Sequence, residues 1–111
     1  MPGHCGDRLS YARLLTVRIR PGRKEEAIEI IDDFGKQPAE GFEGMLTLLP
    51  TDDPDRVTFI TMWDSERSML NSQRDVVPKA VELLGDLVIG KVEIRNHQVR
   101  EMRTQKALVR A

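Results

Sequence analysis

Apolar and polar residues alternate in the first periodic part of the chain, from Tyr11 to Arg20. Leu15, Val17 and Ile19 occupy every second position, which is the period of a strand with one buried face. The Pro21-Gly22 pair that follows is typical of a turn. The pattern therefore predicts a half-buried strand that ends at this turn.

The apolar spacing becomes helical between Arg23 and Phe34. One face of such a helix carries the apolar residues Ala27, Ile30, Ile31 and Phe34, and the other face carries acidic residues. Gly35 follows as a C-terminal stop. We therefore expect an amphipathic helix here.

Two further apolar runs, Gly41 to Pro50 and Arg56 to Trp63, flank a short segment of turn-forming residues. This segment, Thr51 to Asp55, contains three aspartates and a proline, which favour turns through backbone hydrogen bonds and a fixed φ. The pattern predicts a β-hairpin.

A second helical region follows the hairpin. Asp64 or Ser65 provides the short side-chain oxygen that caps a helix, and the first part of the helix runs from Ser65 to Ser72. A second part, Val76 to Leu84, tolerates Pro78 in its first turn, because the amides there have no intrahelical acceptor. We expect a kinked or two-part helix, followed by a long last strand from Leu87 to about Arg103.

The order strand, helix, strand, strand, helix, strand predicts an α+β fold of the ferredoxin-like βαββαβ plan, with a four-stranded antiparallel sheet. Right-handed crossovers place both helical regions on one face of that sheet. We expect one domain over residues 11–104, a flexible lead-in over 1–10 and a C-terminal tail over 105–111.

Both faces of the hairpin carry apolar side chains. Met45, Leu49, Phe59 and Trp63 would face the helices, and the opposite face would carry Leu46, Leu48, Ile60 and Met62. One helical layer cannot cover both faces, and an uncovered apolar face is an interaction surface. We therefore expect a homodimer that packs sheet against sheet.

Composition and charge argue against several classes of partner and location, but they do not identify the function. The chain has 111 residues, 32% of them charged, and a formal net charge of −1, so neither a nucleic acid nor a membrane is favoured as a partner. The single Cys5 excludes an intramolecular disulfide framework, and no apolar run approaches the ~20 residues of a membrane helix. Without the apolar core of a secretory signal in the first ten residues, a cytoplasmic protein is expected.

Four segments together resemble the antibiotic biosynthesis monooxygenase family of the dimeric α/β barrel superfamily. They are Val17 to Glu26, Gly41 to Gly44, Asp52 to Val57 and Met62 to Glu66, in this order and spacing. The resemblance implies two ferredoxin-like protomers that form a barrel, with a ligand pocket between the sheet and the helices of each.

The resemblance also implies two kinds of chemistry. In the haem-degrading branch, the pocket carries an asparagine on the first strand, a tryptophan at the end of the third and a histidine on the helix. Here Leu15 stands at the asparagine position and Gln73 at the histidine position, so only Trp63 matches and we expect no cofactor. In the other branch, a cofactor-independent monooxygenase deprotonates an electron-rich aromatic or quinol-like molecule, whose carbanion reacts with oxygen.

We therefore take Trp63, Asn71 and Gln73 as candidate catalytic residues. Trp63 would stack on the substrate, while the two amides, with Thr16 or Thr61, would exchange hydrogen bonds with it. The candidate substrate pocket consists of Leu15, Val17, Phe59 and Thr61.

Simpler interpretations stand beside these. Core packing is the simpler explanation of Trp63, and a solvated helix surface explains Asn71 and Gln73. The turn aspartates are explained by backbone needs rather than by a metal. His97 could act as a base, but a charge ladder on the last strand also explains it. The chain has no phosphate-binding loop or hydrolase motif. A non-catalytic small-molecule-binding or assembly module on the same fold remains the alternative.

Overall fold

Four antiparallel strands form a single sheet in the order β2-β3-β1-β4. The computed structural model describes residues 10–101 and 103, so most of the predicted lead-in and the whole predicted tail lie outside the described residues. The ferredoxin-like arrangement predicted from the sequence is confirmed. Its elements are β1 (Ser10–Ile19), α2 (Lys24–Phe34), β2 (Phe42–Leu48), β3 (Arg56–Trp63), α3 (Glu66–Asp75), α4 (Val77–Leu84), a 3-10 turn (Gly85–Leu87) and β4 (Val88–Val99).

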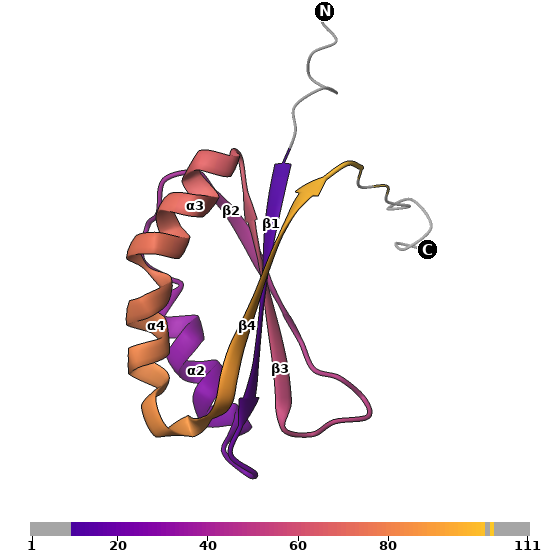
Figure 1. Ribbon diagram of the computed structural model, residues 1–111, viewed down its shortest axis with the longest axis vertical. Coiled ribbons are helices and arrows are strands. Elements are labelled where there is room, and N and C mark those ends of the chain that lie inside the picture. Colours follow the sequence, from indigo (N-terminus) through magenta and orange to yellow (C-terminus); the bar gives the residue numbers. More distant parts are fainter. Residues whose placement is uncertain (1–9, 102, 104–111) are drawn as a thin grey trace, which may run out of the picture.

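Within residues 10–101, the three helices lie together on one side of the sheet and none of them lies on the other side (Figure 1). Between the helices and the sheet lies a core of eight buried residues: Val17, Ile19, Ala27, Ile31, Val57, Phe59, Leu84 and Leu87. These side chains come from β1, β3, α2, α4 and the 3-10 turn, so the core holds both helical regions to the two central strands.

Strand β4 ends at Val99, before the expected end near Arg103. Val99 pairs with Ser10, the first described residue of β1.

The predicted two-part helix is present, with its break at Val76. The Val76 amide donates to the Ser72 carbonyl at 2.7 Å and closes α3, while Pro78 occupies the first turn of α4. Proline has no N–H and cannot continue the ladder of the preceding helix, which explains the interruption. At the other end of α3, the Ser65 hydroxyl accepts a hydrogen bond from the Ser68 amide at 3.1 Å, as expected of an N-cap.

A bulge in the β2–β3 ladder changes the orientation of one aromatic residue. Phe42 pairs with Trp63 and Gly44 pairs with Met62, so Glu43 is the extra residue. Strand side chains alternate between faces, and one inserted residue moves everything beyond it to the other face. The bulge therefore places Phe42 on the helix side of the sheet.

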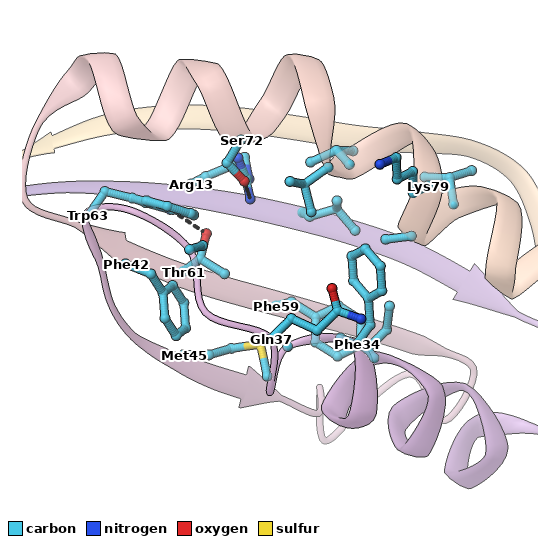
Figure 2. Close-up of a pocket in the computed structure, with 18 of the residues that line it drawn as sticks. Arg13, Phe34, Gln37, Phe42, Met45, Phe59, Thr61, Trp63, Ser72 and Lys79 are labelled. Atoms are coloured by element: carbon cyan, nitrogen blue, oxygen red, sulfur yellow. Dashed lines mark hydrogen bonds between the residues drawn. The ribbon is translucent and has the colours of Figure 1, made fainter.

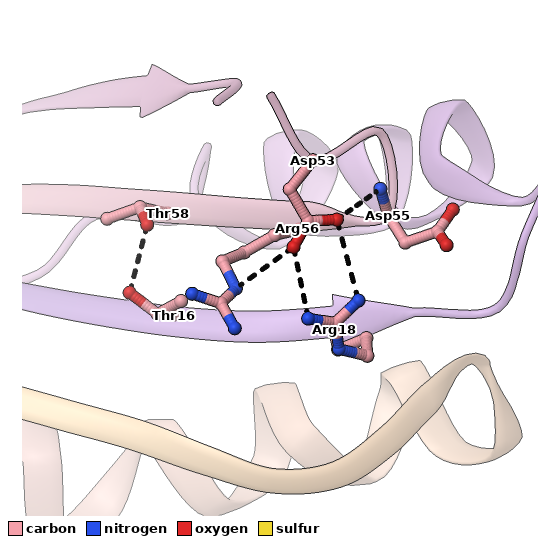
Figure 3. Close-up of polar contacts among 6 residues, drawn as sticks. All are labelled: Thr16, Arg18, Asp53, Asp55, Arg56 and Thr58. Carbon is pink, nitrogen blue, oxygen red and sulfur yellow. Dashed lines mark hydrogen bonds and ion pairs between the residues drawn. The ribbon is translucent and has the colours of Figure 1, made fainter. Parts of the chain in front are cut away.

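The hairpin turn is held by Asp53 at the far end of the sheet (Figure 3). Its carboxylate accepts hydrogen bonds from the Asp55 amide at 3.1 Å and from the Arg18 guanidinium at 3.0 Å and 3.4 Å. The Arg56 Nε lies 3.7 Å from the same carboxylate. The hydrogen bond from the Asp55 backbone amide is the largest of the causes that hold the pKa of Asp53 below its usual range. The turn hydrogen bond and the two arginines explain why an aspartate stands at position 53 without a metal ion.

The helix-free face of the sheet carries large apolar side chains. Leu46 and Leu48 of β2 are 57% and 45% exposed, and Ile60 of β3, the partner of Leu46, is half-buried. Among the described residues, no helix or loop covers this surface (Figure 1). An apolar surface of this kind is typical of an interface with another molecule.

Candidate functional site

A cavity of about 190 Å³ lies between the sheet and the helices (Figure 2). Its floor comes from β1, β2 and β3, and its other walls come from α2, the segment after it, α3 and α4. The lining is mostly apolar, which suits a small hydrophobic molecule. The lining includes Arg13, Leu15, Phe42, Thr61, Trp63 and Lys79.

Trp63 closes one end of the cavity. Its side chain is 2% exposed and its indole Nε1 donates a hydrogen bond to Thr61 Oγ1 at 2.8 Å. The Phe42 ring meets the Trp63 ring edge to face, with centroids 5.4 Å apart and an interplanar angle of 66°. These contacts fix the indole plane, so the ring is preorganised as a wall of the cavity.

Gly41 allows the chain to pass close to α3 beside this wall. Its φ is +80°, a conformation that side-chain-bearing residues rarely adopt, and its carbonyl accepts from the Asp64 amide at 2.9 Å. A Cβ at this position would lie 2.3 Å from the Ser68 hydroxyl oxygen. Only glycine fits here, and it sets the positions of Phe42 and the start of α3.

Arg13 is a buried cation in the wall of the cavity. It is 5% exposed, and its guanidinium donates to the Met69 carbonyl at 3.1 Å and to Ser72 Oγ at 3.3 Å. Its Cζ lies 5.4 Å from the centroid of the Trp63 ring, within cation–π range. Burial lowers the pKa of the Arg13 guanidinium to about 10, so it stays protonated at neutral pH. Within residues 10–101, no carboxylate forms an ion pair with it.

The charged side chains that line the cavity are all positive. Arg13 and Lys79 are its cations, and Gln37, Thr61 and Ser72 add neutral polar groups. Among the described residues that line the cavity there is no carboxylate and no histidine. The arrangement can attract an anionic group and donate hydrogen bonds to it, but it offers no conventional general base.

Four of the residues singled out from the sequence line this cavity: Leu15, Phe59, Thr61 and Trp63. Val17 lies deeper in the core and is 1% exposed. Asn71 is exposed on α3. The Gln73 Oε1 atom accepts a hydrogen bond from the Asn96 side-chain Nδ2 at 2.8 Å. None of these three is among the lining residues.

Two other sequence candidates lie elsewhere. Thr16 faces the helix-free side of the sheet, where its hydroxyl lies 2.9 Å from that of Thr58 (Figure 3). His97 lies on β4 and borders a separate polar hollow of about 200 Å³ with Tyr11 and Glu66. Neither side chain lines the cavity at Trp63.

Sequence reasoning missed Arg13, Phe42 and Lys79. Arg13 had a usable signal, because it lies two residues before Leu15 and four before Val17 and so shares their buried face. A cation on the core face of a strand is unusual and marks a special environment. Phe42 had no such signal, since only the bulge at Glu43 directs it inward.

The donor set does not suit haem or a metal ion. The lining of the described cavity has no histidine. Gln73, which stands at the position of the helix histidine of the haem-degrading branch, accepts a hydrogen bond from the Asn96 side chain instead. Over the part of the chain that the structure describes, no three His, Cys, Asp or Glu side chains gather as a metal site would require.

Comparison with known proteins identifies the family. The model of the family described as "Antibiotic biosynthesis monooxygenase" matches residues 10–76, from β1 to the end of α3. The chain belongs to this family, and the resemblance noted in the sequence is confirmed. A search of curated protein sequences found no match.

Solved structures support the same fold. "Putative antibiotic biosynthesis monooxygenase from Nitrosomonas europaea" is similar with a TM-score of 0.71 and 12% identity, over 82% of this chain and 90% of that one. A protein of the same printed name from Chloroflexus aurantiacus has a TM-score of 0.64 and 20% identity, over 86% and 96%. A Nitrosomonas europaea protein of unknown function has a TM-score of 0.71 and 9% identity, over 88% and 96%. At these identities the likeness establishes the fold alone.

None of the helices within residues 10–101 is both long and apolar enough to cross a membrane.

Proposed function

We propose that this protein is a cofactor-independent monooxygenase that oxidises a small aromatic or quinol-like molecule in the cavity at Trp63. The observation that carries the proposal is an apolar cavity of about 190 Å³ with a fixed indole wall, in a chain of the antibiotic biosynthesis monooxygenase family. A cavity of about 150 Å³ accommodates benzene in another protein, so this one has room for a small aromatic ring system.

The proposed reaction needs no external reductant, because the substrate supplies all the electrons. A ring CH₂ between two aryl rings that are conjugated with a carbonyl loses a proton, and the carbanion gives its electrons to O₂ and forms a C–O bond. The peroxide anion then takes a proton back on its outer oxygen. The resulting hydroperoxide loses water as its O–O bond breaks, which leaves a carbonyl. The balance for an anthrone is anthrone plus O₂ gives anthraquinone plus water.

Two groups in the cavity would assist this chemistry. The Trp63 face would stack on the aromatic substrate, held in position by Thr61 and Phe42. The Arg13 guanidinium would stabilise negative charge on the bound substrate, and its interaction is strong because water is largely excluded. Asn71 and Gln73 remain candidates from the sequence, and their variants test a role for them.

The second candidate function is a non-catalytic small-molecule-binding or assembly module. It is favoured by one observation, namely that the described lining has neither a carboxylate nor a histidine to accept the substrate proton. If the protein is instead a monooxygenase, the base that accepts the substrate proton would be water or a group outside the described lining.

We further propose that the working unit is a homodimer formed through the helix-free face of the sheet. Leu46, Leu48 and Ile60 support this interface, because a second copy would remove their apolar surface from water. The two sheets would then enclose a barrel with one cavity on the helix side of each protomer.

The function is tested by oxygen uptake of protein freed of metal by a chelator, with a panel of anthrones and hydroquinones. Saturable uptake above the uncatalysed rate, strongly reduced in Trp63→Ala and partly retained in Trp63→Phe, is expected. Asn71→Ala and Gln73→Ala test the two amides, and Leu83→Ala on the outer surface of α4 is the control. No uptake above the uncatalysed rate with any member of the panel would favour the binding module.

A further inference from the structure

We propose that the cavity selects aromatic molecules that carry a carboxylate, and that Arg13 binds this carboxylate. The inference deepens the proposed function, on whose cavity it rests, by naming the class of ligand. It would hold equally for an enzyme and for a binding module.

Arg13 carries a buried positive charge that no carboxylate balances within residues 10–101. The side chain is 5% exposed and makes no ion pair within residues 10–101. Removing a cation from water without a counter-ion is costly, and proteins ordinarily pair such groups. A ligand that brings a negative charge into the cavity would supply the missing partner.

The Arg13 guanidinium also has N–H donors that its two hydrogen bonds leave unused. A guanidinium has five N–H groups, and the Met69 carbonyl and Ser72 Oγ accept only two hydrogen bonds from Arg13. The remaining N–H groups belong to a planar fork that matches the two oxygens of a carboxylate. A single ionised phenol oxygen uses this fork less fully, which favours a carboxylate.

The charged residues that line the cavity are all basic. The chain has 18 acidic and 17 basic residues, yet the described lining includes Arg13 and Lys79 and no acidic side chain. This lining would not repel an anion, and the exposed Lys79 adds a second positive charge to that of Arg13. Most of the remaining lining residues are apolar and suit the ring of the same ligand.

The test uses Trp63 as its reporter, because it is the only tryptophan and its indole N–H gives a single ¹H–¹⁵N resonance. Benzoate and benzamide are titrated into the full-length protein without oxygen turnover. They have nearly the same shape and differ in charge. Charge-assisted hydrogen bonds predict that benzoate binds at least about tenfold more tightly.

Arg13→Met removes the charge and keeps most of the side-chain volume. The proposal predicts that the preference for benzoate falls to near one in this variant and is partly retained in Arg13→Lys. Arg67→Met removes the same charge from an exposed position on α3 and should leave the preference unchanged. A purely structural role of Arg13 would weaken both ligands equally and leave their ratio intact.

Several results would overturn the proposal. They are equal binding of benzoate and benzamide, a preference that survives in folded Arg13→Met, or no binding of either probe to the wild type. Titration of 4-nitrophenolate separates the two sources of an anionic oxygen. Binding of this phenolate without binding of benzoate would also overturn the carboxylate assignment. Because binding is measured apart from oxygen uptake, its failure is distinct from failure of the proposed oxidation.

Discussion

The guanidinium carbon of Arg13 lies 5.4 Å from the centroid of the Trp63 ring. The two residues lie on neighbouring strands, β1 and β3, and both face the helices. One supplies a buried positive charge and the other a flat apolar wall, so a single cavity offers the two features that an ionisable aromatic molecule needs. This pairing connects the ferredoxin-like fold to the proposed chemistry.

Trp63 is the first residue to vary. Replacing it with alanine leaves a void and should lower the free energy of unfolding by about 3–5 kcal/mol. Trp63→Phe keeps an aromatic wall but loses the hydrogen bond to Thr61 and should cost less, about 1–2 kcal/mol. Urea denaturation measures both. Equal losses in the two variants would show that the ring itself contributes little.

Gly41 and Gly22 form a matched pair, since both have a φ of +80°. Alanine at Gly22 would meet no atom within 4 Å, whereas at Gly41 it would meet the Ser68 and Asp64 side chains. Gly22→Ala should therefore cost only the backbone strain, about 1 kcal/mol, and Gly41→Ala should cost a further 1–3 kcal/mol by overpacking.

Thermal or urea unfolding of the two glycine variants tests this difference. Ligand affinity should also fall in Gly41→Ala, because Phe42 and the start of α3 would shift. Equal stability of the two variants would contradict the close contact at Gly41.

The proposed dimer predicts opposite outcomes for two exposed leucines. Leu46 is 57% exposed on the helix-free face of the sheet, and Leu83 is 54% exposed on α4. Leu46→Glu should convert a dimer to a monomer, because it places a charge in an apolar interface, while Leu83→Glu should have no effect. Size-exclusion chromatography with light scattering measures the mass. A wild-type protein with the mass of one chain at micromolar concentration would contradict the dimer.

Asp53 predicts a dependence of stability on pH. The Asp55 amide, together with Arg18 and Arg56, holds the pKa of Asp53 below its usual value in the folded protein. A carboxyl with a lowered folded pKa stabilises the fold above its unfolded pKa, and this contribution is lost as the pH falls through the folded pKa. The loss should therefore begin near the unfolded value of about 3.9 and continue below it.

Urea unfolding of the wild type and Asp53→Asn from neutral to acidic pH measures this contribution. The two free energies of unfolding should differ most at neutral pH and converge as the pH falls. Asp52→Asn, in the same turn, is the control for loss of one negative charge. A constant difference between wild type and Asp53→Asn at all pH values would contradict the prediction.

The fold could be predicted from the sequence because the spacing of apolar residues in its strands and helices is clear and depends only on nearby residues. Leu15, Val17 and Ile19 alternate as a strand requires, and Ser65 caps α3 as expected. The end of β4 was misplaced because strand pairing is a long-range property that local composition does not show: Val99 pairs with Ser10, more than 80 residues earlier in the chain.

The cavity was only partly predictable. Trp63, Leu15, Phe59 and Thr61 face it because they share the helix side of the sheet, which alternation identifies. Which residues of that side border empty space depends on how the helices pack, and Val17 is covered by them. The bulge at Glu43 and the exposed position of Asn71 likewise follow from tertiary structure rather than from the pattern.

The most direct test of the proposed monooxygenase is the source of oxygen in its product. Metal-free protein is incubated with an anthrone that it turns over, under ¹⁸O₂, and the quinone is analysed by mass spectrometry. The proposal predicts one ¹⁸O atom in each product molecule formed by the wild type, and product formation at only the uncatalysed rate with Trp63→Ala. Product that carries oxygen from water alone, or wild-type formation no faster than the uncatalysed reaction for every substrate, would contradict it.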